Sequence, residues 1–324
     1  MTTETIVFAT VLACATLAGG HLYRVLWIRQ RGTETIPTGF GAFIAVALLL
    51  AAAVFHPSGR ILGVFAILVV ATAIYWLDDA FGLSARFRMG LSFLSGILIC
   101  AVLVSELNDV PVGLLALLCL VAGFVNVLLT NVVNFYDGAD LNLATFIALT
   151  CGFVLLFSTG RDFIALSAVA CSAFIVPFAF MNRRPRTIYL GDAGSFAFAT
   201  FVTTMVIIYF AAPQQLAAEV AIPLGFPIVD TFYVFCYRII KRHDLLTRNY
   251  LHLYQKLNSH YMGFGYLLPQ VASAFLALTG SQVLRRYGLS DFWAVAIAMV
   301  VVTIPFYFAC RQFLLPRVDV GTPA

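Results

Sequence analysis

The chain has 324 residues, of which 62% are hydrophobic and only 10% are charged, and its formal net charge is +4. A soluble domain usually carries about 25% charged residues, so this chain cannot cover a surface that faces water and we expect lipid to be its main solvent. The seven cysteines show no metal-ligand spacing and lie in apolar runs, which excludes a zinc site or a disulfide framework as the organising element.

Apolar segments of the length that crosses a bilayer, about 20 residues, recur along the whole chain. The first of them follows no positively charged stretch, so we interpret it as a retained span and not as a removed signal peptide. We predict an all-α polytopic membrane protein with a bundle of about eleven transmembrane helices, or ten if the weakest, 141–159, is not a span. The predicted spans are 5–27, 39–55, 61–77, 90–107, 111–130, 141–159, 162–180, 194–211, 219–238, 265–284 and 291–310.

The basic residues divide unequally between the two sides of this bundle. One side holds only Arg60, Arg161, Arg285 and Arg286, and the other side, with its flanking helix ends, holds the remaining 15 of the 19 Lys and Arg residues. Because basic connections stay in the cytoplasm, we predict an N-terminus outside and a cytoplasmic C-terminus. The cytoplasmic connections are then 28–38, 78–89, 131–140, 181–193, 239–264 and the tail from 311.

Two adjacent carboxylates, Asp78 and Asp79, stand where the third predicted span reaches the cytoplasm. Adjacent like charges repel each other, so a nearby cation would make the pair better tolerated. Neighbouring helical residues point about 100° apart, so only one of the two is expected to face a shared site. A solvated helix end is the plainer interpretation.

Four polar side chains then recur every three residues, at Asn131, Asn134, Asp137 and Asp140, and Gly138 offers a bend that would bring them together. Carboxylate and amide oxygens suit Mg²⁺ or Mn²⁺. Asn side chains could equally hydrogen-bond a ribose or a base. A loop turn with Asx capping is the alternative to a binding site.

A glycine-flanked acid opens the eighth predicted span, in the sequence Gly191-Asp192-Ala193-Gly194-Ser195. Both glycines allow close backbone approach, and the free amides of a helix N-terminus favour phosphate. Asp192 is predicted either to cap this helix or to ligate a metal ion that bridges phosphates.

The last cytoplasmic connection joins an acid within a span to a basic stretch with histidines. A carboxylate such as Asp230 costs about 2.5–3.5 kcal/mol at mid-helix in a bilayer, so it usually faces protein or water. Arg248 and His252 follow, and we predict that they contact an anionic substrate. A basic surface beside anionic lipid is the alternative. All four groups fall on one face, which indicates a phosphoryl-transfer site.

In order and spacing, these residues resemble the polyprenyl-phosphate N-acetylhexosamine-1-phosphate transferase family, also called glycosyltransferase family 4. The likeness covers residues 35–260, roughly, and is carried by Asp78-Asp79, by the N-x-x-N-x-x-D-G-x-D pattern from Asn131, by GDxGS at 191–195 and by PxxDT at 227–231. His252-Leu253-Tyr254-Gln255 looks closer to the branch that acts on UDP-N-acetylamino sugars. The chain departs from the pattern at Leu141, where a glycine is usual, at Asn249, where a histidine is often found, and in a reduced segment at 37–41.

The resemblance implies a Mg²⁺-dependent enzyme, with Mn²⁺ as the alternative ion, that forms one transmembrane transferase domain over residues 1–324 of a bacterial inner membrane protein. Undecaprenyl or another polyprenyl phosphate would attack the β-phosphate of a UDP-N-acetylamino sugar and release UMP. The lipid-linked sugar would start a cell-envelope glycan, such as a cell wall polymer or the O-antigen of lipopolysaccharide. Membrane lipid and a second copy in a homodimer are the other implied partners, and nucleic acid is not one.

The roles that follow are predictions about particular residues. The catalytic residues are Asp78, Asp79, Asp192 and His252, the metal ligands are Asp192 and Asp137, and the substrate-binding residues are Asn131, Asn134, Asp137, Asp140, Gly191, Gly194 and Arg248. A one-step transfer and a route through an aspartyl-phosphate both stay open. The alternatives in function are a phospho-MurNAc-pentapeptide transferase, which makes lipid I, and a secondary transporter, although transporters often show internal repeats and none is evident in this sequence.

Overall fold

The computed structural model describes residues 2–33, 35–105, 111–158, 163–183, 187–211, 216–244, 250–260 and 263–315. Every named element in these ranges is a helix, which confirms the all-α prediction. The chain divides into two compact units, Met1–Ala217 and Ala218–Ala324. The single transferase domain predicted over 1–324 concerns how these units act together and stays a prediction.

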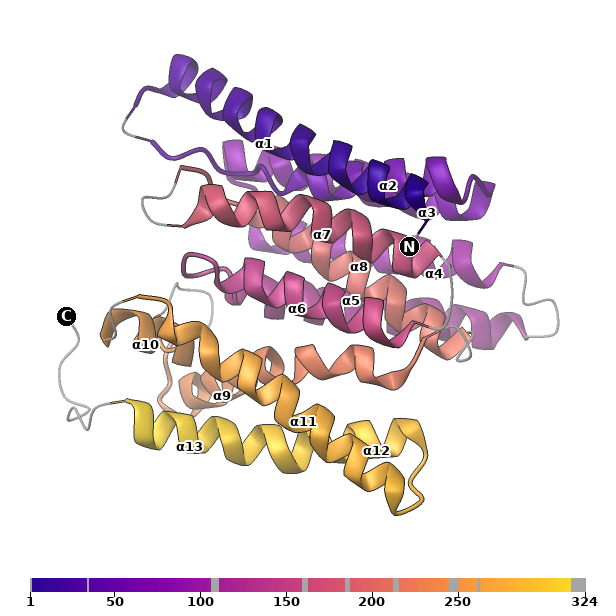
Figure 1. Ribbon diagram of the computed structural model, residues 1–324, viewed down its shortest axis with the longest axis vertical. Coiled ribbons are helices and arrows are strands. Elements are labelled where there is room, and N and C mark those ends of the chain that lie inside the picture. The colour runs from indigo at the N-terminus through magenta and orange to yellow at the C-terminus, as the bar shows by residue number, and fades with distance from the viewer. Residues whose placement is uncertain are drawn as a thin grey trace. The chain divides into compact units, whose positions relative to one another are not determined.

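The first unit is built from helices that run alongside one another (Figure 1). They are α1 (Thr3–Arg31), α2 (Ala42–Phe55), α3 (Gly59–Phe81), α4 (Ala85–Val104), α5 (Val112–Phe135), α6 (Asn142–Phe157), α7 (Phe163–Asn182) and α8 (Gly191–Ala211). The second unit contains η1 (Ala218–Leu224), α9 (Gly225–Ile240), α10 (Leu253–His260), η2 (Gly265–Leu267), α11 (Leu268–Arg286), α12 (Asp291–Ala298), the π-helical η3 (Met299–Thr303) and α13 (Ile304–Leu314).

Nine helical stretches among the described residues are long and apolar enough to cross a membrane, and α2 and α6 are apolar but shorter. Each of the eleven predicted spans overlaps one of these stretches. The chain is therefore a multi-pass membrane protein by length and composition, while the count of eleven crossings and the placement of the termini stay predictions.

Short polar residues and a glycine set the boundaries of the helices that lead into the site. The side chain of Ser58 accepts a hydrogen bond from the N–H of Ile61 at the start of α3, and Ser84 does the same for Phe87 at the start of α4, as N-cap residues do. Between these helices, Gly82 has a φ of 72°, which a glycine adopts without steric cost. The turn is short, so the end of α3 and the start of α4 stay together.

Helix α8 is the most enclosed helix of the first unit, because 83% of the residues in its apolar stretch are buried. It packs against α2, α3, α4 and α5. The ring of Tyr75 in α3 stacks on Phe196 in α8 at 4.1 Å between centroids. The buried Asn126 of α5 donates to the carbonyl of Ser92 at 2.8 Å and accepts from the hydroxyl of Thr203 at 2.9 Å. These bonds link α4, α5 and α8 while they satisfy a polar side chain inside an apolar bundle.

Four connections of the first unit meet at one end of the bundle. The N–H of Gly41, before α2, donates to the carbonyl of Leu190, before α8, at 2.8 Å. The N–H of Leu141, before α6, donates to the side chain of Asn182, at the end of α7, at 2.8 Å. The end of α3 also meets the start of α8, as described below. The sequence-based grouping of these four connections on one face is thereby confirmed.

Candidate functional site

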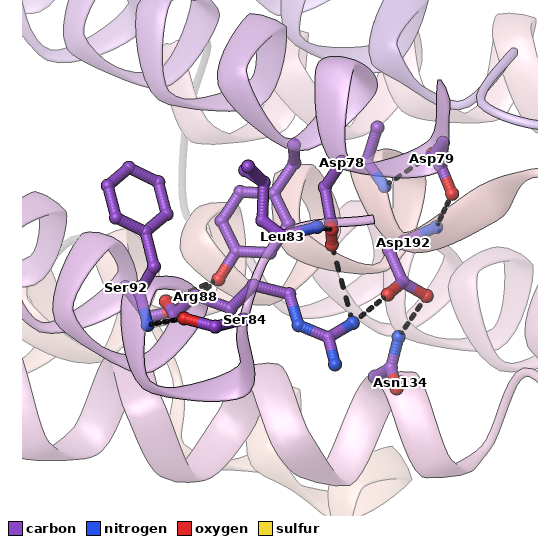
Figure 2. A network of polar contacts seen from close by, with 11 residues as sticks. Asp78, Asp79, Leu83, Ser84, Arg88, Ser92, Asn134 and Asp192 are labelled. Carbon is purple, nitrogen blue, oxygen red and sulfur yellow. Dashed lines mark hydrogen bonds and ion pairs between the residues drawn. The ribbon is translucent and has the colours of Figure 1, made fainter. Parts of the chain in front are cut away.

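A network of polar contacts occupies this end of the first unit (Figure 2). At its centre is Asp192, in the first turn of α8. Its Oδ2 lies 2.5 Å from Nη1 of Arg88 in α4, and its Oδ1 accepts a hydrogen bond of 2.7 Å from the amide of Asn134 in α5. The Asp192 side chain is 33% exposed. Two helices, α4 and α5, therefore each contribute one side chain to a carboxylate of α8 that solutes can reach.

Asp78 is the buried carboxylate of the predicted pair, with a side chain only 4% exposed. One of its oxygens lies 3.3 Å from Nη1 of Arg88, and the other accepts the backbone N–H of Leu83. Arg88 thus stands between Asp78 and Asp192 (Figure 2). A cation near the acidic pair was predicted from charge repulsion, and Arg88 supplies it.

Asp79 performs a different task, because its carboxylate caps α8. Its Oδ1 accepts the N–H of Asp192 at 3.0 Å and its Oδ2 accepts the N–H of Ala193 at 3.2 Å. Unpaired amides at a helix start favour a negative partner. Capping of α8 is one of the two roles predicted for Asp192. In the structure, Asp79 performs it. These two hydrogen bonds occupy N–H groups that the sequence suggested as a binding site for phosphate.

The glycines around Asp192 permit close approach of backbone to backbone. Gly191 has a φ of 79°, and an added Cβ there would overlap the carboxylate of Asp79 and the backbone of Gly39. An added Cβ on Gly194 would lie 2.9 Å from the Cα of Gly41, closer than packed atoms allow. The predicted close approach is confirmed, and the approaching group is the protein's own chain. The predicted contact of both glycines with substrate stays a prediction.

The pattern from Asn131 to Asp140 does not converge as a whole. Asn131 donates to the carbonyl of Val127 in its own helix at 2.8 Å, and Asp140 is buried. Asp137 is half-buried just beyond α5, and no described residue binds its carboxylate. Burial raises the pKa of Asp137 well above its usual value, and the carboxylates of Asp192 and Asp79 raise it further. Of this pattern, Asn134 hydrogen-bonds Asp192, and Asp137 lies near enough to Asp192 and Asp79 for their charges to act on it.

A second polar cluster lies within the second unit. Asp230 of α9 is fully buried, and it accepts hydrogen bonds from the hydroxyl of Tyr307 at 2.8 Å and from the N–H of Leu253 at 2.9 Å. Its Oδ2 lies 2.8 Å from Nδ1 of His252, whose side chain is only 3% exposed. Asp230 faces protein, as predicted for an acid within a span. The catalytic role of His252 stays a prediction, and Arg248 lies outside the described residues.

The network of the first unit offers oxygen ligands suited to one kind of metal ion. Within the part of the chain that the structure describes, no three Asp, Glu, His or Cys side chains lie together as a metal site. Mg²⁺, however, is usually held by one or two carboxylates, with water and substrate phosphates completing its shell. The carboxylates of Asp192 and Asp137 and the amide of Asn134 are groups of the kind that meet this requirement.

Arg88 is the residue of this network that the sequence did not single out. It is one of several arginines on the connections predicted to be cytoplasmic, so the sequence distinguishes it only as part of the basic face. Its position ten residues after Asp78, in the first turns of a helix that soon becomes apolar, was the available signal. The hydroxyl of Tyr75 donates to the carbonyl of Arg88 at 2.7 Å and fixes the start of α4 against α3.

An apolar helical bundle with acids, an amide and an arginine at one end defines a multi-pass membrane protein with a polar site at that end of the bundle. The family model for glycosyl transferase family 4 matches residues 61–210, which lie within the first unit and include this network. A phospho-N-acetylmuramoyl-pentapeptide-transferase of Streptococcus suis is 30% identical over 226 residues, which cover 62% of this chain and 67% of the relative. The chain belongs to glycosyl transferase family 4.

The matches to two further relatives cover a smaller share of the relative. A phospho-N-acetylmuramoyl-pentapeptide-transferase of Microcystis aeruginosa is 26% identical over 189 residues, which are 52% of this chain and 52% of the relative. A probable undecaprenyl-phosphate N-acetylglucosaminyl 1-phosphate transferase of Bacillus subtilis is 26% identical over 243 residues, which are 70% of this chain and 65% of the relative. The match thus spans between half and two thirds of these two relatives.

Proposed function

We propose that this protein transfers an N-acetylhexosamine-type sugar-1-phosphate from a UDP-sugar to undecaprenyl or another polyprenyl phosphate. The observation that carries the proposal is the half-exposed Asp192 carboxylate, held by Arg88 and Asn134 at one end of an apolar bundle. A lipid phosphate and a soluble diphosphate can meet only where the bilayer ends. Family membership supports a transferase over a secondary transporter.

The reaction needs charge control more than a strong base. A phosphate monoester has a second pKa of about 6, so the lipid phosphate carries a nucleophilic oxygen at neutral pH. That oxygen forms a bond to the β-phosphorus of the UDP-sugar, the bond from this phosphorus to the bridging oxygen breaks, and UMP leaves with the electron pair. The difficult task is to bring two polyanions together, which cationic and hydrogen-bonding groups achieve.

The residues of the network divide this task among themselves. Asp192, Asp137 and the amide of Asn134 would hold Mg²⁺, or Mn²⁺ as the alternative, and the bound ion would neutralise charge on the diphosphate. Arg88 adds a guanidinium beside the same point. Asp79 acts through the backbone, because its bonds to the N–H groups of Asp192 and Ala193 fix the start of α8.

The sugar is proposed from the sequence around His252. The order His252-Leu253-Tyr254-Gln255 favours a UDP-N-acetylamino sugar such as UDP-N-acetylglucosamine, and the name of the Bacillus subtilis relative agrees with this choice. A phospho-MurNAc-pentapeptide transferase is the second candidate, because two of the relatives carry that name. With either sugar, the product would start a lipid-linked cell-envelope glycan.

The site is proposed to face the cytoplasm of a bacterial inner membrane, where nucleotide sugars are made. The support for this orientation is the concentration of Lys and Arg on the connections that share the face of Asp192. A homodimer remains the expected assembly by family likeness.

The test is a transfer assay with the full chain, purified in lipid nanodiscs with undecaprenyl phosphate and Mg²⁺. UDP-N-acetylglucosamine, UDP-N-acetylgalactosamine and UDP-MurNAc-pentapeptide are supplied singly, and UMP release and the lipid product are measured by mass spectrometry. We expect release with an N-acetylhexosamine donor. Release with UDP-MurNAc-pentapeptide alone would select the second candidate, and no release with any donor would contradict the proposed function.

A further inference from the structure

The guanidinium of Arg88 lies where a metal ion on Asp192 would have to bind. Nη1 of Arg88 is 2.5 Å from Oδ2 of Asp192, while Oδ1 of the same carboxylate accepts the amide of Asn134 at 2.7 Å. Both carboxylate oxygens are therefore engaged by the protein itself (Figure 2). Two cations cannot occupy the same side of one carboxylate oxygen, because they repel each other and need the same lone pairs.

The environment of Arg88 allows it to change partners without leaving the site. Its side chain is 37% exposed, whereas that of Asp78, its second partner at 3.3 Å, is 4% exposed. Asp78 is itself fixed, since its other oxygen accepts the N–H of Leu83. If the contact with Asp192 breaks, the buried Asp78 therefore still holds the guanidinium nearby.

Arg88 also has unused hydrogen-bond donors. A guanidinium carries five N–H donors in a planar fork that fits phosphate. Both contacts of Arg88 with acids go through Nη1, and no described residue accepts a hydrogen bond from its Nε or Nη2. These donors lie beside a carboxylate that solutes can reach, so a phosphate oxygen is a suitable acceptor for them.

We propose that Arg88 is the resident counter-ion of Asp192, and that it passes from Asp192 to a phosphate oxygen of the diphosphate substrate when a divalent cation binds the carboxylate. This inference rests on the proposed function for its second half, the transfer to a phosphate. Its first half, the competition between Arg88 and the cation, concerns Asp192 alone and is testable without any substrate.

The first measurement is the affinity of the purified full chain for Mn²⁺, followed by electron paramagnetic resonance in the absence of nucleotide and lipid phosphate. Arg88→Gln removes the competing charge, so we expect Mn²⁺ to bind about fivefold more tightly or better. The matched control is Arg86→Gln, which removes the same charge from an exposed position in the same turn of α4 and should leave the affinity unchanged. An unchanged or weakened Mn²⁺ affinity in Arg88→Gln would overturn the proposal.

A lysine variant protects this test against loss of folding. Arg88→Lys keeps the charge but loses the planar fork, so it should bind Mn²⁺ with an affinity between those of the wild type and Arg88→Gln. Affinity equal to the wild type would count against the proposal. A merely structural role for Arg88 would lower metal affinity in both variants, because the start of α4 would be displaced.

The second measurement is UDP binding by calorimetry at saturating Mn²⁺. Arg88→Gln should bind UDP about tenfold more weakly than the wild type, since a charged hydrogen bond to phosphate is lost, and Arg86→Gln should bind it as the wild type does. Equal UDP affinity in all three proteins would refute the transfer of Arg88 to phosphate. Failure of the proposed reaction would appear separately, as absent UMP release from a wild-type protein that still shows the competition at Asp192.

Discussion

Two polar clusters in the described part of the chain are each built around an aspartate, and they differ in access to solvent. In the first unit, the side chains of Asp192 and Arg88 are 33% and 37% exposed. In the second unit, the side chains of Asp230 and His252 are 0% and 3% exposed. Asp192 contacts two side chains, and Asp230 contacts two side chains and one backbone N–H. Each aspartate lies near a side chain that is positively charged or can be protonated.

The difference separates a site that can exchange partners from one that cannot. A half-exposed carboxylate can release Arg88 and accept another cation at little cost, because water replaces the lost contact. A fully buried carboxylate such as Asp230 must keep its partners, because an unpaired buried charge is strongly destabilising. We therefore propose that the cluster around Asp192 (the open cluster) carries the chemistry. The contacts of Asp230 with Leu253 and Tyr307 hold α10 and α13 against α9 in the other cluster (the buried cluster).

The largest expected effect tests the open cluster. Asp192→Asn removes the charge for which Arg88 and a metal ion would compete, so transfer should fall by about 100-fold or more, while the unfolding temperature changes little. UMP release and thermal unfolding of the same preparation measure the two quantities. Glu4→Gln, an exposed acid in the first turn of α1, is the control. Near-normal transfer by Asp192→Asn would break the assignment.

The next effect tests the buried cluster. Asp230→Asn replaces an acceptor of three hydrogen bonds by a group that must present an N–H₂ to one of its donors, so the free energy of unfolding should fall by about 2–3 kcal/mol. Thermal unfolding in detergent measures the loss, and the exposed Asp244→Asn serves as its control. If Asp230→Asn instead kept full stability and lost transfer, the buried cluster would be catalytic as well.

A smaller effect concerns Asp79, an acid that lies in the open cluster but has a structural contact. Asp79→Ala leaves two helix-end amides without a partner and should cost about 1–2 kcal/mol of stability, whereas Asp79→Asn keeps an acceptor oxygen and should recover most of it. Comparison of the unfolding temperatures of both variants measures this difference. Full stability together with a loss of transfer as large as that of Asp192→Asn would show that Asp79 carries chemistry.

The smallest effect concerns strain at the border of the open cluster. Leu141 has a φ of 62°, which costs a residue with a side chain about 1–2 kcal/mol. Leu141→Gly should therefore raise the free energy of unfolding by up to about 1 kcal/mol, after the greater freedom of glycine in the unfolded chain is subtracted. Leu155→Gly, at an exposed position within α6, should lower it by a similar amount. A less stable Leu141→Gly would show that the leucine side chain contributes more by packing than its backbone costs.

Hydropathy made the helices predictable, because a bilayer admits few other structures. Each predicted span overlaps a helix, and three residues of the predicted motifs, Asp78, Asp192 and Asn134, lie in one network of contacts. It was the contacts between distant segments that escaped prediction. That Asp79 caps α8 depends on α3 ending beside residue 192, and that Asn131 bonds the carbonyl of Val127 depends on the conformation of its side chain. Neither property is encoded in local sequence.

The same limit explains why Arg88 was missed. A basic residue near a helix start on the cytoplasmic side satisfies the rule for membrane orientation without any further role. Only its distances to Asp78 and Asp192 distinguish it from the exposed Arg86 two residues earlier. In this chain, charge counts predict the face, and geometry is needed to identify the residue.

The absence of side chains between Gly41 and Gly194 has a consequence for how the position of Asp192 is specified. Where two backbones touch through glycines, sliding one segment by a single residue would bring a side chain into a space that admits none. The alignment of the segment before α2 with the start of α8 is therefore discrete, like the register of two paired strands. Thermal motion or a remote substitution can loosen this contact or break it, but cannot shift it gradually. The Asp192 carboxylate is therefore either at its position in the site or displaced from it.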